Sequence, residues 1–79
     1  MLLKTLVEML PGEEGVVKNV AGGRGMVRRL YCMGIFPGQR IKKLSGIGRG
    51  GPVVVEVMRT KVAIGFGMAS RILVEIHGG

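Results

Sequence analysis

Arg24, Arg28, Arg29 and Tyr31 lie close together in GGRGMVRRLYCMGIFPGQRI, residues 22–41. Guanidinium groups bind carboxylates and phosphates, and tyrosine and arginine are frequent in the centres of protein-binding surfaces. Gly22, Gly23 and Gly25 precede a helical pattern, and the free amides at the start of a helix can attract an anion. No Lys-Ser or Lys-Thr follows these glycines, so the stretch is not a P-loop. It predicts either a partner-binding surface or a tight turn into a helix.

The candidate partner-binding residues are the basic side chains of this stretch and of the strand after it, together with the tyrosine. They are Arg24, Arg28, Arg29, Tyr31, Lys42 and Lys43. Runs of basic residues often form only a solvated face. Here two arginines and an aromatic residue share one short helix, which favours a surface that contacts a partner.

Other reactive side chains are few. His77 is the only histidine, Cys32 is the only cysteine, and there is no aspartate. Neither residue has a neighbour at the spacing of a catalytic pair or a metal site. We therefore expect no enzymatic activity, no metal ligands and no cofactor, and we expect Cys32 to be a half-buried thiol.

Residues 46–51, GIGRGG, match the G-x-G-x-x-G pattern of dinucleotide-binding proteins. In those proteins a helix follows the glycines and binds the pyrophosphate at its N-terminus. Here Pro52 and the run VVVEV follow instead, and this run is typical of a strand. The pattern therefore predicts a loop between two strands.

The composition favours an acidic partner. Twelve Lys and Arg against five acidic residues give a net charge of +7. Nucleic acid, an anionic membrane surface and an acidic protein all fit this charge. Only Tyr31, Phe36 and Phe66 are aromatic, and single-stranded nucleic-acid binders need more such residues for stacking, which lowers the expectation for nucleic acid.

Seventy-nine residues are expected to form one domain, 1–79. The opening MLLKTLVEMLPG is interrupted by Lys4, Glu8 and Pro11, so it predicts neither a membrane span nor a signal peptide. The single cysteine excludes an internal disulfide. We expect an unprocessed cytoplasmic protein that starts at Met1.

Short strands separated by glycines dominate the rest of the pattern. Thr5 and Glu8 have the spacing of a capping box and predict a short helical turn that ends at Pro11. A helix is predicted over 26–33, with Gly34 as a left-handed stop. Strands are predicted over 14–20, 39–45, 52–58, 61–65 and 71–77, with a helical turn over 66–70.

These elements predict a mainly β fold, a small five-stranded barrel with one short helix after the first strand. Val53, Val55 and Val57 form one clean apolar face, and Ile72, Val74 and Ile76 form another. The strand after Gly38 is expected to be bulged or amphipathic at its end, because Leu44 breaks the alternation.

The order of apolar residues and glycines resembles the FeoA family, the small ferrous iron transport protein A. The likeness spans nearly the whole chain, and its most specific element is RRLYCMGIFPGQRI, which resembles the family pattern R-L-x-x-M-G-[apolar]-x-P-G. The other matching positions are Leu6, Pro11-Gly12, Gly15, Val17, Val20, Gly51-Pro52, Val62-Ala63-Ile64, Ala69, Ile72 and Val74.

The resemblance implies an SH3-like barrel, which also forms the C-terminal module of iron-dependent repressors; we expect a standalone protein here. It gives a structural role to the motif residues Leu30, Met33, Gly34, Pro37, Gly38, Gly51 and Pro52. It also implies a cytoplasmic accessory of FeoB, the inner-membrane ferrous iron transporter with a cytoplasmic GTPase domain. The expected position is then at the inner face of the membrane.

Two other functions and one form of assembly stay open from the residues. A basic barrel that binds nucleic acid fits the charge and the R-G-G at Arg49. The terminal LVEIHGG resembles ubiquitin-like carriers, which end in Gly-Gly, although their fold places a long helix after a β-hairpin. Exposed strand edges could also pair copies of the chain into a homo-oligomer.

Overall fold

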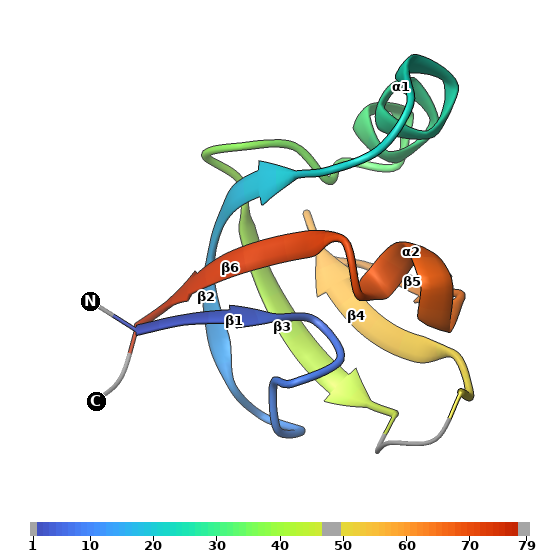
Figure 1. The fold of residues 1–79 in the computed structure, drawn as a ribbon. Coiled ribbons are helices and arrows are strands. Elements are labelled where there is room, and N and C mark those ends of the chain that lie inside the picture. The colour runs from blue at the N-terminus through green and yellow to red at the C-terminus, as the bar shows by residue number, and fades with distance from the viewer. Residues whose placement is uncertain (1, 47–49, 78–79) are drawn as a thin grey trace.

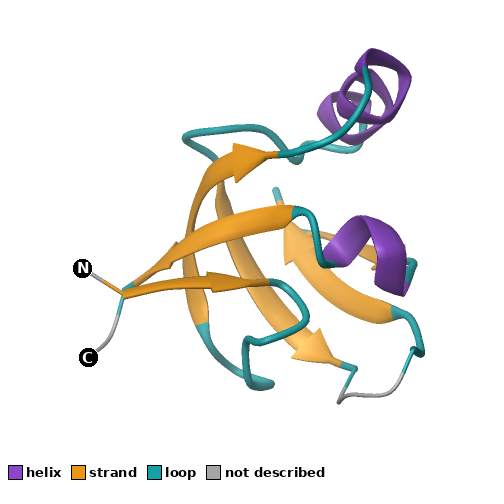
Figure 2. Ribbon diagram, in the orientation of Figure 1, coloured by secondary structure: helices purple, strands orange, loops and turns teal. Residues whose placement is uncertain are grey.

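Six antiparallel strands form one curved sheet around the core, and two short helices lie outside it (Figures 1 and 2). The computed structural model describes residues 2–46 and 50–77. The sheet order is β1-β6-β2-β3-β4-β5. The elements are β1 (Leu2–Thr5), β2 (Glu14–Val20), α1 (Arg24–Cys32), β3 (Arg40–Ser45), β4 (Val53–Val57), β5 (Thr60–Ile64), α2 (Phe66–Ala69) and β6 (Ile72–Ile76).

The predicted strands all form, but the sheet has six strands where the sequence predicts five. The additional strand is β1, which pairs with β6 from Leu2 opposite Ile76 to Thr5 opposite Leu73. The capping box beside it is confirmed: the Thr5 N–H donates to Glu8 Oε1 (2.8 Å) and the Glu8 N–H donates to Thr5 Oγ1 (3.2 Å). The box closes one turn only. Helix α1 starts two residues before its predicted start, at Arg24.

Alternation along the strands fills the core as predicted. Val53, Val55 and Val57 are buried on β4, and Ile72 and Val74 are buried on β6. The pairing register shifts between Lys43 and Ser45, which confirms the bulge in β3. A second register shift, between Val17 and Asn19, lets both Val17 and Val20 face the core despite their odd spacing.

Lys43 is a charged residue inside this core, with an exposed fraction of only 1%. Its Nζ donates to the carbonyl oxygens of Val7 (3.1 Å) and Met9 (2.5 Å). Burial lowers the pKa of this ammonium group. Because a buried donor must be paired, Lys43 holds the turn after β1 against β3. Leu6 and Met9 of that turn are also buried.

Glu13 fastens the other side of the same turn. Its Oε1 accepts a hydrogen bond from the Leu10 N–H (2.6 Å), and its carboxylate pairs with Lys4 Nζ at 3.1 Å. The bond from Leu10, followed by the bond from Lys4, holds the pKa of Glu13 below its ordinary value of 4.5. The folded state therefore favours the ionised carboxylate.

We expect Lys43→Met to lower the free energy of unfolding by about 1–3 kcal/mol, because it leaves the buried carbonyl group of Met9 and the half-buried one of Val7 without this donor. Urea unfolding measures this change. The control is Lys42→Met at the next, half-exposed position, where we expect a loss below about 1 kcal/mol. Equal losses at the two positions would contradict the role of Lys43.

The lowered pKa of Glu13 predicts a pH dependence with a defined sign. Its stabilising contribution is fully present above pH 4.5 and is lost as the pH falls through the lower pKa of the folded state. At neutral pH the wild type should therefore be more stable than Glu13→Gln. Unfolding measured from pH 7 downward should show this difference shrinking below pH 4.5; a constant difference would exclude the ionised carboxylate as its source.

Candidate partner-binding site

Helix α1 lies at one end of the molecule, beyond the end of β2 (Figure 1). It starts after Gly23, whose backbone is extended and which provides no side-chain cap. The first turn carries no acidic residue. The positive end of the helix dipole is therefore not balanced by the helix itself, and Arg24 adds to its field.

A Schellman motif ends the helix. The Ile35 N–H donates to the Leu30 carbonyl (2.8 Å), and the Gly34 N–H donates to the Tyr31 carbonyl (3.0 Å). Gly34 has a φ of +89°, which a residue with a Cβ adopts only under strain. Leu30 and Ile35 are both buried, so the motif anchors the end of α1 in the core. This confirms the predicted left-handed stop at Gly34.

A tight turn leads the chain from the motif into β3. The Gln39 N–H donates to the Phe36 carbonyl (3.1 Å), and Gly38 has a φ of +96°. Pro37 followed by a left-handed glycine is the pattern of a type II turn. The chain thus leaves β2, forms α1 after Gly22, and returns to β3 through Pro37 and Gly38. One end of the helix is therefore connected to β2 and the other to β3.

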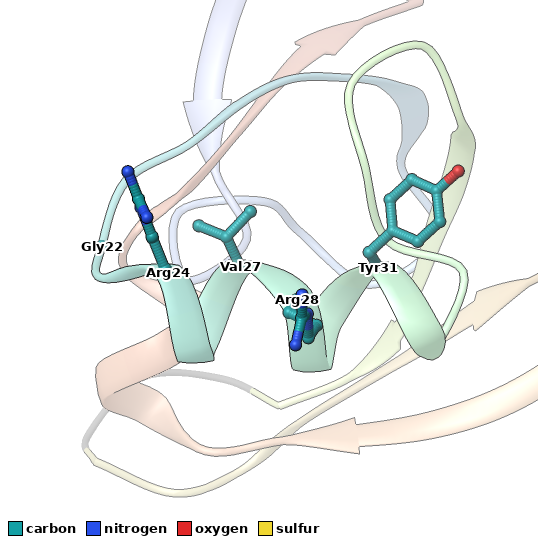
Figure 3. Close-up of a pocket in the computed structure, with 5 residues that line it drawn as sticks. All are labelled: Gly22, Arg24, Val27, Arg28 and Tyr31. Atoms are coloured by element: carbon teal, nitrogen blue, oxygen red, sulfur yellow. The ribbon is translucent and has the colours of Figure 1, made fainter.

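The face of α1 that the core leaves uncovered lines a hollow of about 450 Å³. Its residues are Gly22, Arg24, Val27, Arg28 and Tyr31, and we call it the α1 hollow. Figure 3 shows Arg24, Val27 and Tyr31 extending from the same side of the helix. The spacing 24, 27, 28, 31 is one helical face, and this spacing is the signal by which Val27 could have been assigned to the hollow.

Tyr31 is exposed over 62% of its surface although it is a large aromatic residue. Its ring lies against Phe36, with the ring centroids 4.8 Å apart and the planes tilted by 34°. Such a pair keeps Tyr31 in place without burying it. The hollow therefore has a fixed aromatic wall with arginines beside it.

The arginines of α1 stand apart from the ion pairs found between the described residues. Those pairs join Lys4 to Glu13 and Lys18 to Glu75 (3.4 Å), both on or beside the sheet. Helix α1 contains no acidic residue at all. The three exposed arginines of the helix, Arg24, Arg28 and Arg29, are together called the basic face of α1. Arg24 and Arg28 line the hollow, and Arg29 projects from the helix outside it.

The structure corrects the prediction for Lys43, which is buried and cannot contact a partner from the surface. Lys42 is half-exposed but belongs to a second, smaller hollow on the sheet. The register places Lys42 opposite Glu14 on β2 and Glu56 on β4, and Glu56 opposite Lys61 on β5. Opposite charges in register stabilise a sheet, so the pairing of Lys42 with its neighbours in the sheet accounts for this residue without a binding partner. Arg24, Arg28, Arg29 and Tyr31 come together on α1; Lys42 and Lys43 do not join them.

The assignment of one glycine changes as well. A Cβ on Gly51 would meet no atom within 4 Å, so packing does not require glycine there. Gly46 has a φ of +108°, and a Cβ on it would lie 2.8 Å from the Pro52 carbonyl oxygen. The tight approach in this loop thus belongs to Gly46. As predicted, the strand β4 follows the glycine pattern, whose residues 47–49 lie outside the described residues.

Cys32 is exposed, in contrast to the half-buried thiol that the sequence predicts, because it lies on the outer side of the last helical turn. Within residues 2–46 and 50–77, no three His, Cys, Asp or Glu side chains gather where they could bind a metal ion. Over the same residues, neither helix has the length and hydropathy needed to span a membrane.

Comparison with known proteins identifies the fold and then the family. A crystal structure of the iron uptake regulatory protein FeoA has 36% identity and a TM-score of 0.88, and the match covers 95% of this chain and 99% of that one. The FeoA of Stenotrophomonas maltophilia, solved with zinc and described as an SH3 domain protein, has 25% identity and a TM-score of 0.75 over 91% and 89% of the two chains. The architecture is therefore that of a small SH3-like domain.

The sequence comparisons name the family. The FeoA domain matches residues 4–76. One relative is a protein of Methanocaldococcus jannaschii whose name describes it as an Fe(2+) transport protein A. The two sequences are 39% identical over 64 residues, and this match covers 81% of this chain and 76% of that protein. The chain belongs to the FeoA family, a family of ferrous iron transport accessory proteins.

The two faces of α1 predict losses of different size on truncation. Leu30→Ala should lower the free energy of unfolding by about 2–5 kcal/mol, because Leu30 is fully buried under the helix. Tyr31→Ala should lower it by less than about 1.5 kcal/mol, since most of the ring is already in solvent. Chemical denaturation of both variants tests this. A large loss for Tyr31→Ala would mean that the residue serves the fold.

Proposed function

We propose that this protein is a non-enzymatic cytoplasmic accessory of ferrous iron uptake that binds the cytoplasmic, GTPase-bearing region of the FeoB transporter. The observation that carries the proposal is the α1 hollow, where Arg24 and Arg28 flank the apolar surface of Val27 and Tyr31. Membership of the FeoA family supplies the link to ferrous iron transport. The binding role is to dock on the transporter and support or regulate its activity.

The chemistry of the α1 hollow favours a protein partner. Tyrosine and arginine are enriched among the residues that contribute most to binding energy, and an apolar centre with a charged border is the usual arrangement of an interface. A partner segment with carboxylates can reach Arg24 and Arg28 while an apolar side chain contacts Val27. An acidic partner would also be attracted from a distance by the net charge of +7.

A second candidate function, binding of nucleic acid, rests on the same net charge. The exposed aromatic rings in the described part of the chain are those of Tyr31 and Phe66, and they lie on different helices. Bases need neighbouring rings for stacking, so this arrangement favours a protein partner. Arg49 of the R-G-G sequence and the terminal Gly78-Gly79 fall outside the described residues.

An anionic membrane surface beside the transporter could share the basic face of α1. Phosphate headgroups attract arginine through charge and do not need the apolar centre of the hollow. Binding to the membrane would therefore depend on Arg24, Arg28 and Arg29 together and little on Tyr31. Binding to a protein should depend on Tyr31 as well.

The test is recovery of the transporter by the tagged protein from its native membranes, at low and moderate salt. Arg28→Gln with Arg29→Gln should reduce recovery at least about tenfold, because it removes one guanidinium group that lines the α1 hollow and another from the same basic helix. The matched control is Lys61→Gln with Arg71→Gln, which lowers the net charge equally with exposed residues of other elements. Undiminished recovery with the α1 variant would contradict the α1 surface.

Two other outcomes identify a different function. Recovery of nucleic acid alone, lost as the salt concentration rises, would favour the nucleic-acid reading. Binding to protein-free anionic vesicles that is insensitive to Tyr31→Ala would favour the membrane surface. Either result without recovery of the transporter would contradict the proposal.

A further inference from the structure

The hairpin between β4 and β5 has an unfavourable backbone at its tip. Val57 pairs with Thr60, so Met58 and Arg59 alone form the turn. Their φ angles are +48° and +63°, and in the described part of the chain they are the two non-glycine residues with positive φ. Two-residue turns of this kind are normally built from Asn-Gly, which tolerates the left-handed conformation. The turn itself therefore gives no reason for methionine and arginine.

The side chains at the tip are exposed and close to α1. Met58 is exposed over 63% of its surface, and Arg59 is exposed beside it. The Met58 Cε lies only 2.8 Å from where a Cβ on Gly34 would be, so the methionine reaches across the residue that ends α1. Methionine is flexible and polarisable, and exposed methionines serve adaptable protein-binding surfaces.

The charges around the tip are not all compensated. A hollow of about 200 Å³ adjoins it and is lined by Glu14, Arg40, Ile41, Lys42, Glu56, Met58 and Arg59. Lys42 lies in register between Glu14 and Glu56. Arg40 lies opposite Val16, and neither Arg40 nor Arg59 takes part in the ion pairs formed between described residues. Two guanidinium groups therefore remain beside the exposed methionine.

We propose that Met58, Arg59 and Arg40 form a second docking surface, the hairpin tip, for an acidic segment of the same transporter region. An apolar side chain of that segment contacts Met58, and its carboxylates pair with Arg59 and Arg40. The hairpin tip and the α1 hollow share no lining residue, so one partner can occupy both. This inference rests on the proposed function, because it names a further contact of the same partner.

The exposed methionine favours a protein segment here over nucleic acid. Phosphate would pair with Arg40 and Arg59 but leave Met58 in solvent. A strained turn whose own geometry favours other residues also agrees with the tendency of backbone strain to occur at functional positions. Because the turn is strained, replacing its two residues should raise the stability of the protein while it weakens binding, so the two effects can be told apart.

Replacement of the tip by Met58→Asn with Arg59→Gly creates the favoured turn and removes both side chains. We expect Tm to rise by roughly 5 °C, because the left-handed residues lose their strain. Isothermal titration with the purified cytoplasmic region of the cognate ferrous iron transporter should show affinity at least about tenfold weaker. A turn with only a structural role would raise Tm and leave the affinity unchanged.

Further variants keep the result decisive. Arg40→Gln with Arg59→Gln leaves the type of turn unchanged and should also weaken binding, so unchanged affinity there overturns the inference even if the first variant folds poorly. Met58→Leu with Arg59→Lys should bind within about threefold of the wild type, since it keeps an apolar and a charged group.

Leu10→Asn removes an exposed apolar residue elsewhere and should bind like the wild type. If the wild-type protein does not bind the transporter region, both the proposed function and this inference are wrong. If binding is lost only in Arg28→Gln with Arg29→Gln, the proposed function stands and the docking role of the hairpin tip is wrong.

Discussion

The left-handed backbone at Gly34 is the constraint on which the site depends. It allows the chain to reverse after α1 so that Leu30, on the last turn, and Ile35, just beyond it, enter the same core. With the helix anchored by that one edge, the opposite face cannot reach the sheet. Arg24, Val27, Arg28 and Tyr31 therefore stay at the surface because of how the helix ends, and their arrangement follows from 3.6 residues per turn. A glycine in the middle of a family motif thus determines which side chains of α1 face the solvent.

The distribution of the charges matters more than their sum. On the sheet, Lys18 faces Glu75, Lys4 faces Glu13, and Lys42 lies between two glutamates. Inside it, two carbonyl groups satisfy Lys43. These cations act within the fold and contribute little to attracting a specific partner at short range. The arginines of α1 and of the hairpin tip have no such acidic neighbours in register, so their charges are not offset in the same way.

Local patterns in the sequence predict the elements that local physics decides. Gly34, Pro37 and Gly38 act within a few residues of themselves, so the end of α1 and the following turn could be predicted. Strand β1 could not, because its partner β6 lies at the far end of the chain and a capping box overlaps its last residue. The burial of Lys43 depends on carbonyl groups 36 and 34 positions away, and no basic run in a sequence reveals them. The importance of Gly46 could not be predicted either, because it depends on Pro52 and Val53, which lie too close to Gly46 to leave room for a Cβ.

The contact between Met58 and Gly34 links the two surfaces physically. The methionine of the hairpin tip reaches across the residue whose conformation orients α1. A partner that moves Met58 therefore acts on the packing around the helix end, and a partner that pulls on α1 acts on the hairpin. Because Leu30 and Ile35 are buried on one side and Val57 on the other, this junction has little freedom to rearrange. The α1 hollow and the hairpin tip are thus held at a fixed separation by the core, so a partner that occupied both proposed surfaces would bind more tightly than at either surface alone.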